Sequence, residues 1–144
     1  MVASTAADVP SRVVFYDGVC ALCNRAVQQL LRLDRTGCLW FAPLQGSTAA
    51  ALRRRHPEIP ARLDSIVFLE LDEGTERVCW HAEALFRIAA TIGLDSWQLR
   101  WARRLPRWCA DLAYRLFARV RYRAYGRLAV CPLPPSDKRD RFLP

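Results

Sequence analysis

Apolar and polar residues alternate along the first 92 residues in two distinct periods, which together predict a series of strands and helices. Short apolar runs bounded by Asp, Gly or Pro indicate strands, whereas apolar residues repeating at three- and four-residue steps indicate helices. A turn over 72–75 joins two of the strands as a hairpin. The predicted elements are a strand over 12–16, a helix over 24–35, a strand over 38–42, a helix over 47–55, strands over 65–71 and 77–80, and a helix over 82–92.

This order reads β-α-β-α-β-β-α, which is the connectivity of a thioredoxin-like domain. We therefore predict an α/β fold with a thioredoxin-like core over residues 12–95 and a C-terminal helical extension over 96–144 packed on that core. Residues 1–11 are rich in small side chains and are expected to form a flexible tail. A chain of 144 residues is long enough to bury one hydrophobic core without disulfides.

The extension contains a long amphipathic helix, predicted over 106–125 and ended by Gly126. Its apolar residues repeat at helical steps, and we predict that this stripe packs on the core while the arginines of the helix face solvent. The alternatives are a stripe that forms a ligand groove and an arginine-rich helix that lies on an anionic membrane surface. The stripe comprises Trp108, Cys109, Leu112, Ala113, Leu116, Phe117 and Val120, and the arginines are Arg107, Arg115, Arg119, Arg121 and Arg123.

The net charge of +8 comes almost entirely from arginine, since Lys138 is the only lysine. Because a GC-rich genome also produces this composition, we do not expect nucleic-acid binding. No apolar run approaches the roughly 20 residues of a membrane span, and the N-terminus has no secretory signal pattern. Six cysteines without such a signal favour a reducing, cytoplasmic location over an extracellular disulfide framework.

Cys20 and Cys23 are separated by two residues in the stretch FYDGVCALCN, directly after the first predicted strand. Pairs with this spacing attach haem, bind zinc or exchange as a dithiol and disulfide. Covalent haem attachment needs a His directly after the second cysteine, where this chain has Asn24. Structural zinc needs four ligands, and the chain has no second such pair. A non-catalytic interaction or zinc-binding module, with zinc held by scattered cysteines, stays as the alternative to redox chemistry.

Redox chemistry needs only the residues that are present. At the start of a helix, Cys20 faces unpaired backbone N–H groups and the positive end of the helix dipole, which favour the thiolate. We predict that Cys20 attacks a partner to form a mixed disulfide. Cys23, one helical turn later and expected to be more buried, then resolves that disulfide.

Other residues near the pair have both functional and structural interpretations. Asp17 is either a carboxylate that serves the cysteines, as a proton acceptor for Cys23 or by binding the loop amides, or only the turn residue of an Asp-Gly pair. Tyr16 is a candidate contact beside the dithiol, with packing at the strand end as its alternative. Three further functional interpretations are possible: His81 as a proton shuttle, Cys131 as a third redox cysteine, and an anion site facing the dithiol that is formed by Arg115, Arg119 and Arg121. For each of them we favour a structural or solvent-exposed role instead.

The stretch YDGVCALCN and the residues after it resemble the DCC family of thiol-disulfide oxidoreductases (DUF393, YuxK-like), named for an Asp and two Cys, here Asp17, Cys20 and Cys23. The resemblance covers nearly the whole chain from Arg12 and implies a thioredoxin-like fold with dithiol–disulfide exchange. The blocks that carry it further are FAPL at 41–44, LDSIVFLELDEG at 63–74, AEALFRIAATIG at 82–93, LPRWCADLAYRLFARVRYRAYGR at 105–127 and CPLPPSDKRDRFLP at 131–144. In the block at 105–127, a Tyr-Arg and an Ala-Arg-x-Arg pattern recur in the family.

Two positions depart from the related patterns. Many family members carry Ser or Ser-Asp before the Ala of the helix after the hairpin, where this chain has Ala82-Glu83-Ala84. Thioredoxins place a cis-proline before the third strand, facing the dithiol, where this chain has Asp64-Ser65. Ser65 is therefore a candidate substitute contact for a substrate, with an ordinary strand-entry hydroxyl as the alternative.

Together these features predict an enzyme that exchanges a Cys20–Cys23 dithiol with protein or low-molecular-weight disulfides and needs no bound cofactor. Asp17 is expected to act as a local acid–base or positioning group. The sequence does not indicate whether the protein is a monomer or an oligomer.

Overall fold

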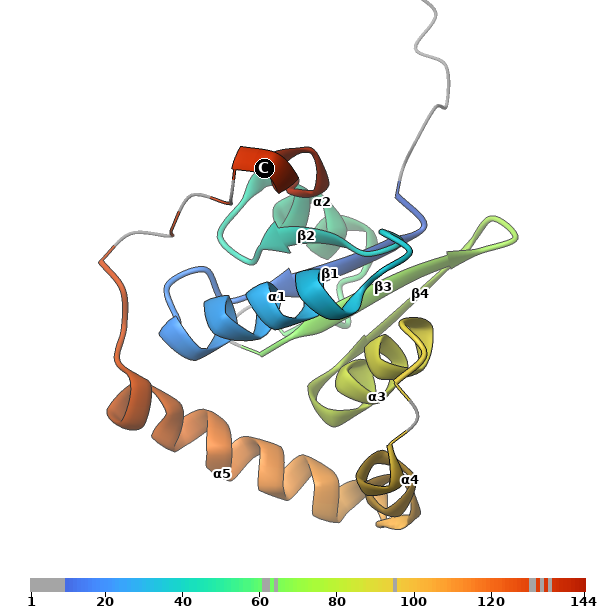
Figure 1. Cartoon of the computed structure of the whole chain (residues 1–144), viewed down its shortest axis with the longest axis vertical. Coiled ribbons are helices and arrows are strands. Elements are labelled where there is room, and N and C mark those ends of the chain that lie inside the picture. Colours follow the sequence, from blue (N-terminus) through green and yellow to red (C-terminus); the bar gives the residue numbers. More distant parts are fainter. Residues whose placement is uncertain are drawn as a thin grey trace, which may run out of the picture.

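The computed structural model describes residues 10–60, 63, 65–94, 96–129, 132, 134 and 136–144. Up to residue 91 its elements follow the predicted β-α-β-α-β-β-α order, so the α/β fold class is confirmed (Figure 1). The elements are β1 (Arg12–Tyr16), α1 (Ala21–Leu33), β2 (Trp40–Pro43), α2 (Ser47–Arg55), β3 (Val67–Asp72), β4 (Thr75–Trp80) and α3 (His81–Thr91).

The four strands form one mixed sheet in the order β2-β1-β3-β4. β1 pairs with β2 in parallel and with β3 in antiparallel orientation, and β3 pairs with β4 as the predicted hairpin. The parallel pair is connected through α1, as a parallel connection requires a crossover. This arrangement is consistent with a thioredoxin-like fold.

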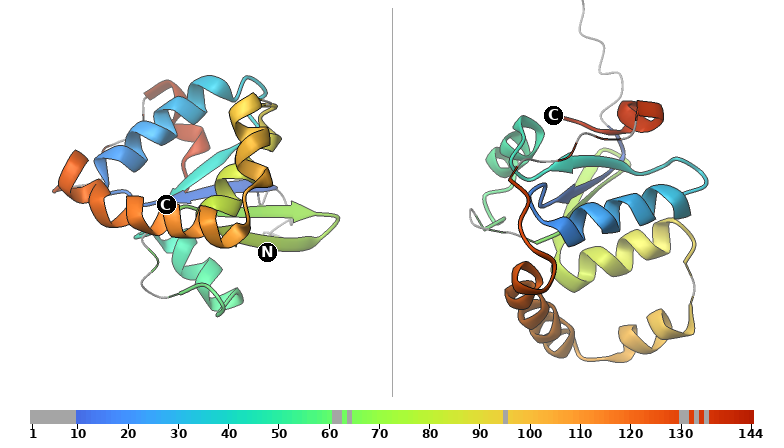
Figure 2. Two further views of the ribbon diagram at one scale, coloured as in Figure 1. Left: turned by 90° about the horizontal axis from the view of Figure 1, so that it is seen from below. Right: turned by 60° about the vertical axis from the view of Figure 1, so that its left-hand side comes forward.

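Both faces of the sheet are covered by helices, which explains why β1 reads as an almost continuous apolar run. α2 lies on one face of the sheet, and α1 and α3 lie on the other (Figure 2). Val13 and Phe15 pack on the α2 side, whereas Val14 and Tyr16 pack on the side of α1 and α3. This alternation follows from the two-residue period of a strand. The α2 side of the core comprises Val13, Phe15, Ala42, Leu44, Ala49, Leu52, Ile59, Leu63, Val67 and Leu69, and the α1–α3 side comprises Val14, Tyr16, Val27, Leu31, Leu39, Phe41, Phe68, Cys79, Ala84 and Ile88.

The C-terminal part adds three helical elements, α4 (Trp97–Arg104), α5 (Arg107–Tyr125) and the 3-10 helix η1 (Ser136–Arg141). The long helix α5 was predicted, whereas α4 and η1 were not. Ser96 caps α4 by accepting a hydrogen bond from the backbone N–H of Leu99, and Gly126 ends α5 with a positive φ of 80°. α5 contacts α1 and α3 on the same side of the sheet.

The prediction that the apolar stripe of α5 packs on the core is wrong. Trp108, Leu112, Leu116 and Val120 are each more than half exposed, and Phe117 is 45% exposed. The helix instead turns Tyr114, Arg121 and Tyr122 toward the domain. The physical reason is the polar network described below, which gives the inward face of α5 buried partners for a guanidinium and two phenols.

The last residues return to the opposite end of the molecule and fasten the chain beside β2 (Figure 2). Arg141 forms an ion pair with the buried carboxylate of Asp34, and Phe142 stacks on Phe41 with ring centroids 5.4 Å apart. The N–H of Leu143 donates to the carbonyl oxygen of Phe41 at 2.8 Å. Among the described residues, no helix combines the length and the hydrophobicity needed to cross a membrane.

Candidate active site

The cysteine pair lies at the junction of β1 and α1, at the edge of the sheet where the central strand ends. The backbone N–H of Cys20 donates to the carbonyl oxygen of Asp17, and the N–H of Val19 donates to Asp17 Oδ1, both at 3.2 Å. Asn24 closes the loop from the other side, because its Nδ2 donates to the carbonyl oxygens of Gly18 and Cys20 at 2.8 and 2.9 Å. Asn24, which stands where a haem-attachment motif would need His, thus holds the cysteine loop in place.

Cys20 occupies the N-cap of α1, as predicted. Its backbone is extended, with φ −87° and ψ 117°, and its Sγ accepts a hydrogen bond from the N–H of Cys23 at 3.4 Å. An N-cap side chain commonly satisfies one of the unpaired amides at a helix start in this way. Both cysteines are free thiols. The sulfur of Cys20 therefore faces the N-terminal amides of the helix, whose dipole favours negative charge.

The predicted order of burial is reversed. Cys20 is fully buried, whereas Cys23 is partly exposed. The cover over Cys20 comes from the chain that follows α5: Arg127 forms a β-bridge with Cys20, and the N–H of Leu128 donates to the carbonyl oxygen of Val19 at 2.7 Å. The expectation rested on the helix alone, and this returning segment lies more than 100 residues away in sequence.

Arg121 of α5 connects the cysteine pair to Asp17. Its Nη1 donates to Cys23 Sγ at 3.5 Å, and its Nη2 lies 3.4 Å from Asp17 Oδ2. The side chains of Arg121 and Asp17 are only 2% and 3% exposed, so the two charges compensate each other inside the domain. Such a pair is stable only when both members are present, because a single buried charge is strongly unfavourable. The prediction that Arg121 faces solvent is therefore wrong.

Two further side chains complete the surroundings of Asp17. Tyr122 donates its hydroxyl hydrogen bond to Asp17 Oδ2, and Gln45 Nε2 donates to Asp17 Oδ1 at 2.9 Å. Gln45 also accepts from the N–H of Gly18 at 3.1 Å, so it spans the loop and the carboxylate. The guanidinium carbons of Arg121 and Arg127 lie 4.7 and 4.8 Å from the centroid of the Tyr122 ring. These cation–π contacts link the cover of Cys20 to the buried ion pair.

The electrostatics of the site keep Cys23 and Tyr122 protonated at neutral pH. Burial and the hydrogen bond with Cys20 raise the pKa of the Cys23 thiol to about 12, although the positive charge of Arg121 acts in the opposite direction. Burial and the hydrogen bond to Asp17 likewise raise the pKa of Tyr122 to about 12. Tyr122 is therefore a lasting hydrogen-bond donor to Asp17.

The partners of Asp17 bear on its two predicted interpretations. The carboxylate turns the chain into the loop and accepts from Val19, Gln45, Tyr122 and Arg121. It reaches Cys23 through the guanidinium of Arg121, which contacts both groups. This geometry is that of a positioning group, while proton transfer to Asp17 stays a prediction.

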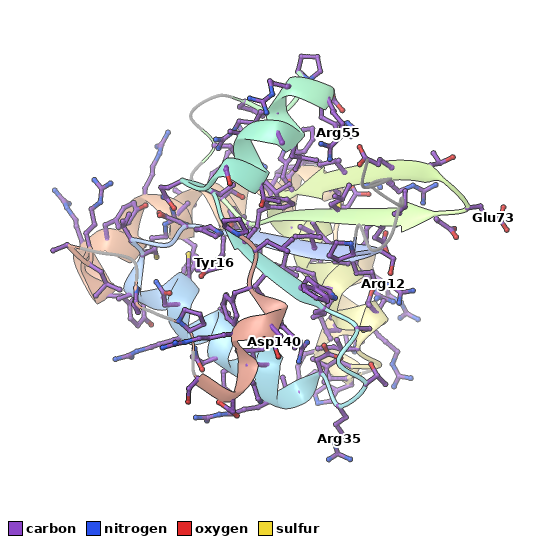
Figure 3. The ribbon with its side chains drawn as sticks, turned by 90° about the horizontal axis from the view of Figure 1, so that it is seen from above. Arg12, Tyr16, Arg35, Arg55, Glu73 and Asp140 are labelled. Atoms are coloured by element: carbon purple, nitrogen blue, oxygen red, sulfur yellow. The ribbon has the colours of Figure 1, made fainter. Side chains whose placement is uncertain are left out.

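Tyr16 and Ser65, the candidate substrate contacts, are both buried. Tyr16 packs in the α1–α3 side of the core, in the interior of the molecule (Figure 3). Ser65 Oγ donates to the hydroxyl of Tyr114 on α5 at 3.1 Å, and the same hydroxyl accepts from the N–H of Ile66 at 3.2 Å. Ser65 therefore ties the entry of β3 to α5. The His81 ring packs at a tilt of 48° against the Tyr114 ring, with centroids 5.2 Å apart.

The remaining cysteines do not join the pair in the part of the chain that the structure describes. Cys79 is buried in the core, and the Sγ of Cys38 donates to Asp34. No three His, Cys, Asp or Glu side chains of the described residues gather in a metal-binding cluster. Cys131, the predicted third candidate, lies outside those residues.

The sequence analysis missed Tyr122 and Gln45, and it favoured solvent exposure for Arg121 over the alternative that this arginine faces the dithiol. The helical stripe grouped Arg121 with the other arginines off the apolar face, and nothing in that pattern marked it as buried. A signal was present in the block at 105–127, because Arg121 and Tyr122 belong to its Ala-Arg-x-Arg and neighbouring Tyr-Arg segments.

Comparisons with known proteins find a family profile and relatives that match most of the chain. Residues 14–127 match the sequence profile of the DCC1-like thiol-disulfide oxidoreductase family. The chain is similar to the uncharacterized protein YuxK of Bacillus subtilis, with 33% identity over 147 residues that cover 97% of this chain and 99% of that protein. It is also similar to the chloroplastic DCC family protein At1g52590 of Arabidopsis thaliana, with 30% identity over 84% of this chain and 69% of that protein. No solved structure matches the chain significantly.

Proposed function

The chain belongs to the DCC1-like thiol-disulfide oxidoreductase family, and from this premise we propose that it exchanges a Cys20–Cys23 dithiol with disulfides of proteins or small molecules. The observation that carries the proposal is the placement of Cys20 at the N-cap of α1 with Cys23 one turn later, its sulfur facing the guanidinium of Arg121. The pair itself is the redox group, so the proposal includes no other cofactor. A reducing compartment such as the cytoplasm suits it.

The exchange proceeds in two substitutions at sulfur. The Cys20 thiolate attacks one sulfur of the substrate disulfide, that S–S bond breaks, and the first substrate thiolate leaves and takes up a proton. Cys23 then loses its proton and attacks Cys20 Sγ, which releases the second substrate thiolate and forms the Cys20–Cys23 disulfide. The substrate gains two electrons and two protons, and a dithiol donor reverses both steps to restore the enzyme.

Arg121 assists the second substitution. Cys23 is a thiol at neutral pH, since its pKa is raised to about 12 mainly by burial, and it must become a thiolate to resolve the mixed disulfide. The guanidinium at 3.5 Å stabilises negative charge on that sulfur as it develops. Asp17, Tyr122 and Gln45 hold the guanidinium and the loop in position. Arg121 is thus the residue of α5 that links the extension to the chemistry.

The cover over Cys20 has a consequence for the first substitution. Because Cys20 is fully buried and its backbone is bridged to Arg127, we propose that the segment 126–128 moves aside when a substrate disulfide reaches the sulfur. The segment is held by one short backbone hydrogen bond from Leu128 and by the contact of Arg127 with Tyr122. A substrate that forms its own contacts with Val19 and Tyr122 would displace the segment and gain access to Cys20.

Trapping of the mixed disulfide tests the proposal. Cys23→Ser, treated with a small aromatic disulfide, is expected to keep a stable adduct on Cys20, which peptide mass spectrometry locates. Cys20→Ser is the matched control and should give no adduct at the same exposure time. If Cys23 carries the faster adduct instead, the assignment of the two roles is reversed. If the purified protein holds stoichiometric zinc and forms no adduct, the zinc-binding module replaces the redox proposal.

A further inference from the structure

The outward side of α4 and α5 carries a large exposed apolar surface, which we call the tryptophan ridge. Trp97, Trp101 and Trp108 are 64%, 62% and 68% exposed, although tryptophan is among the side chains that gain most from burial. Contiguous exposed patches of this kind mark interaction surfaces. The ridge comprises Trp97, Trp101, Trp108, Leu112, Leu116, Phe117 and Val120.

Positive charge runs along the ridge. Besides the buried Arg121, residues 96–125 contain seven arginines and a single acidic residue, Asp111, so their balance is +6 in a chain whose net charge is +8. Arg115, Arg119 and Arg123 recur at four-residue steps and are all exposed, so they form one row beside the apolar residues of α5. On α4 the guanidinium of Arg104 lies 5.4 Å from the centroid of the Trp101 ring.

The ridge lies at the outer edge of the molecule. α4 and α5 both lie at the bottom of Figure 1 and of the right-hand view of Figure 2, whereas the 3-10 helix η1 lies at the opposite end. The inward side of α5 holds Arg121 and Tyr122 in the active-site network. A partner can therefore contact the outward side of α5 without disturbing that network.

We propose that the tryptophan ridge docks the protein on the surface of an anionic lipid membrane. Interfacial helices combine an apolar side that enters the headgroup region with arginines beside it, and tryptophan is enriched at that depth. Each arginine near an anionic surface adds attraction to lipid phosphates. The described helices do not cross the membrane, so the association is peripheral.

A second copy of the chain fits the ridge less well. In a two-fold dimer the same surface meets itself, which would bring two strongly positive surfaces together. Like charges at one interface oppose association. An anionic bilayer, in contrast, complements the charge and offers a flat apolar boundary for tryptophans on two successive helices. This proposal concerns the surface alone and does not depend on the redox role of the cysteines.

Flotation with lipid vesicles tests the proposal. The full chain is expected to float with vesicles of phosphatidylcholine mixed with phosphatidylglycerol and not with phosphatidylcholine alone, with a blue shift in tryptophan fluorescence. Binding should weaken as salt is added, because the arginine contribution is screened. Replacing Arg115, Arg119 and Arg123 together by Gln should weaken partitioning roughly 100-fold. Replacing Trp101 and Trp108 by Ala should weaken it at least about tenfold.

The matched control is the triple variant of Arg35, Arg54 and Arg139 to Gln, which removes the same charge from exposed positions away from the ridge. It should keep most of the binding. Equal losses in the two triple variants would show attraction by net charge only and would overturn the docking surface. No flotation of the natural chain at low salt would also overturn it. A dimer in light scattering that the Trp101→Ala/Trp108→Ala variant abolishes, without vesicle binding, would assign the ridge to a second copy instead.

Discussion

Helices α1 and α5 both have amphipathic sequences, but α1 turns its apolar side toward the core and α5 turns its apolar side toward solvent. α1 buries its apolar residues Val27 and Leu31 against the sheet and exposes Arg25 and Arg32. α5 buries a guanidinium and leaves most of its apolar stripe in solvent. A repeat at helical steps therefore identifies residues that share a side of a helix, but the neighbours decide which side is inside.

Asp17 supplies the reason for the difference. Its carboxylate is buried at the end of the central strand, and a buried charge needs a partner of opposite sign. Arg121 provides that partner, which sets the rotation of α5 about its axis. α1 has no such demand from beneath it, because it rests on Phe41, Phe68 and their neighbours. The ion pair of the site thus accounts for the exposed ridge on the other side of the helix.

Arg121→Met is expected to have the largest effect on stability among the substitutions in α1 and α5. It leaves Asp17 as an unpaired buried charge, and we expect the free energy of unfolding to fall by about 3–5 kcal/mol. The control Arg119→Met changes an exposed residue two positions earlier and should stay within about 0.5 kcal/mol. Urea denaturation followed by circular dichroism measures both. Equal effects of the two variants would mean that α5 is not oriented by the pair.

Truncation of one leucine on each helix compares their apolar sides directly. Leu31→Ala in α1 opens a cavity in the core and should lower the free energy of unfolding by about 2–5 kcal/mol. Leu116→Ala in α5 removes a side chain that is 54% exposed and should stay within about 0.5 kcal/mol. A loss of several kcal/mol at Leu116 would show that the stripe of α5 is buried after all.

Much of this molecule was open to prediction from short-range patterns. The order of seven elements followed from strand and helix periods, and α2 was found at the predicted Ser47–Arg55. The N-cap position of Cys20 followed from its place between a strand and a helix. These features depend on residues close together in sequence, for which periodicity and capping are informative.

The remaining features depend on contacts between distant residues. Arg121 lies 104 residues from Asp17, and the cover of Cys20 comes from the segment after α5. Gln45 reaches Asp17 from 28 residues away. No local pattern distinguishes a buried arginine from the exposed arginines on the same helix. The burial of Cys20 relative to Cys23 was therefore mispredicted, and Arg121 was assigned to solvent.

Tyr122→Phe tests how much the hydrogen bond from the inward side of α5 to Asp17 contributes to stability. The change removes one hydrogen bond to the buried carboxylate of Asp17 and leaves the ring between Arg121 and Arg127. We expect a loss of about 1.5–3 kcal/mol in the free energy of unfolding, as for hydrogen bonds to charged groups. Tyr125→Phe, at an exposed position of the same helix, should change little. Thermal and urea denaturation of both variants would test this difference.

The pH dependence of Cys23 alkylation should differ between the folded and the unfolded chain, which is the smallest effect we predict and the one confined to a single side chain. In the folded protein its pKa is raised to about 12, so its alkylation by iodoacetamide should keep rising well above pH 9. In the unfolded chain the rate should level off near the ordinary thiol value. Mass spectrometry of the peptide with Cys23 resolves the two profiles. Identical profiles would contradict the burial of this sulfur beneath α5.

Redox titration of the full chain in glutathione buffers is the sharpest test of the proposed redox centre. We expect one reversible two-electron transition, in which peptide mapping finds the disulfide between Cys20 and Cys23 and the other cysteines stay reduced. Absence of that transition, or a disulfide that joins either residue to Cys38, Cys79 or Cys109, would contradict the claim that this pair is the redox centre.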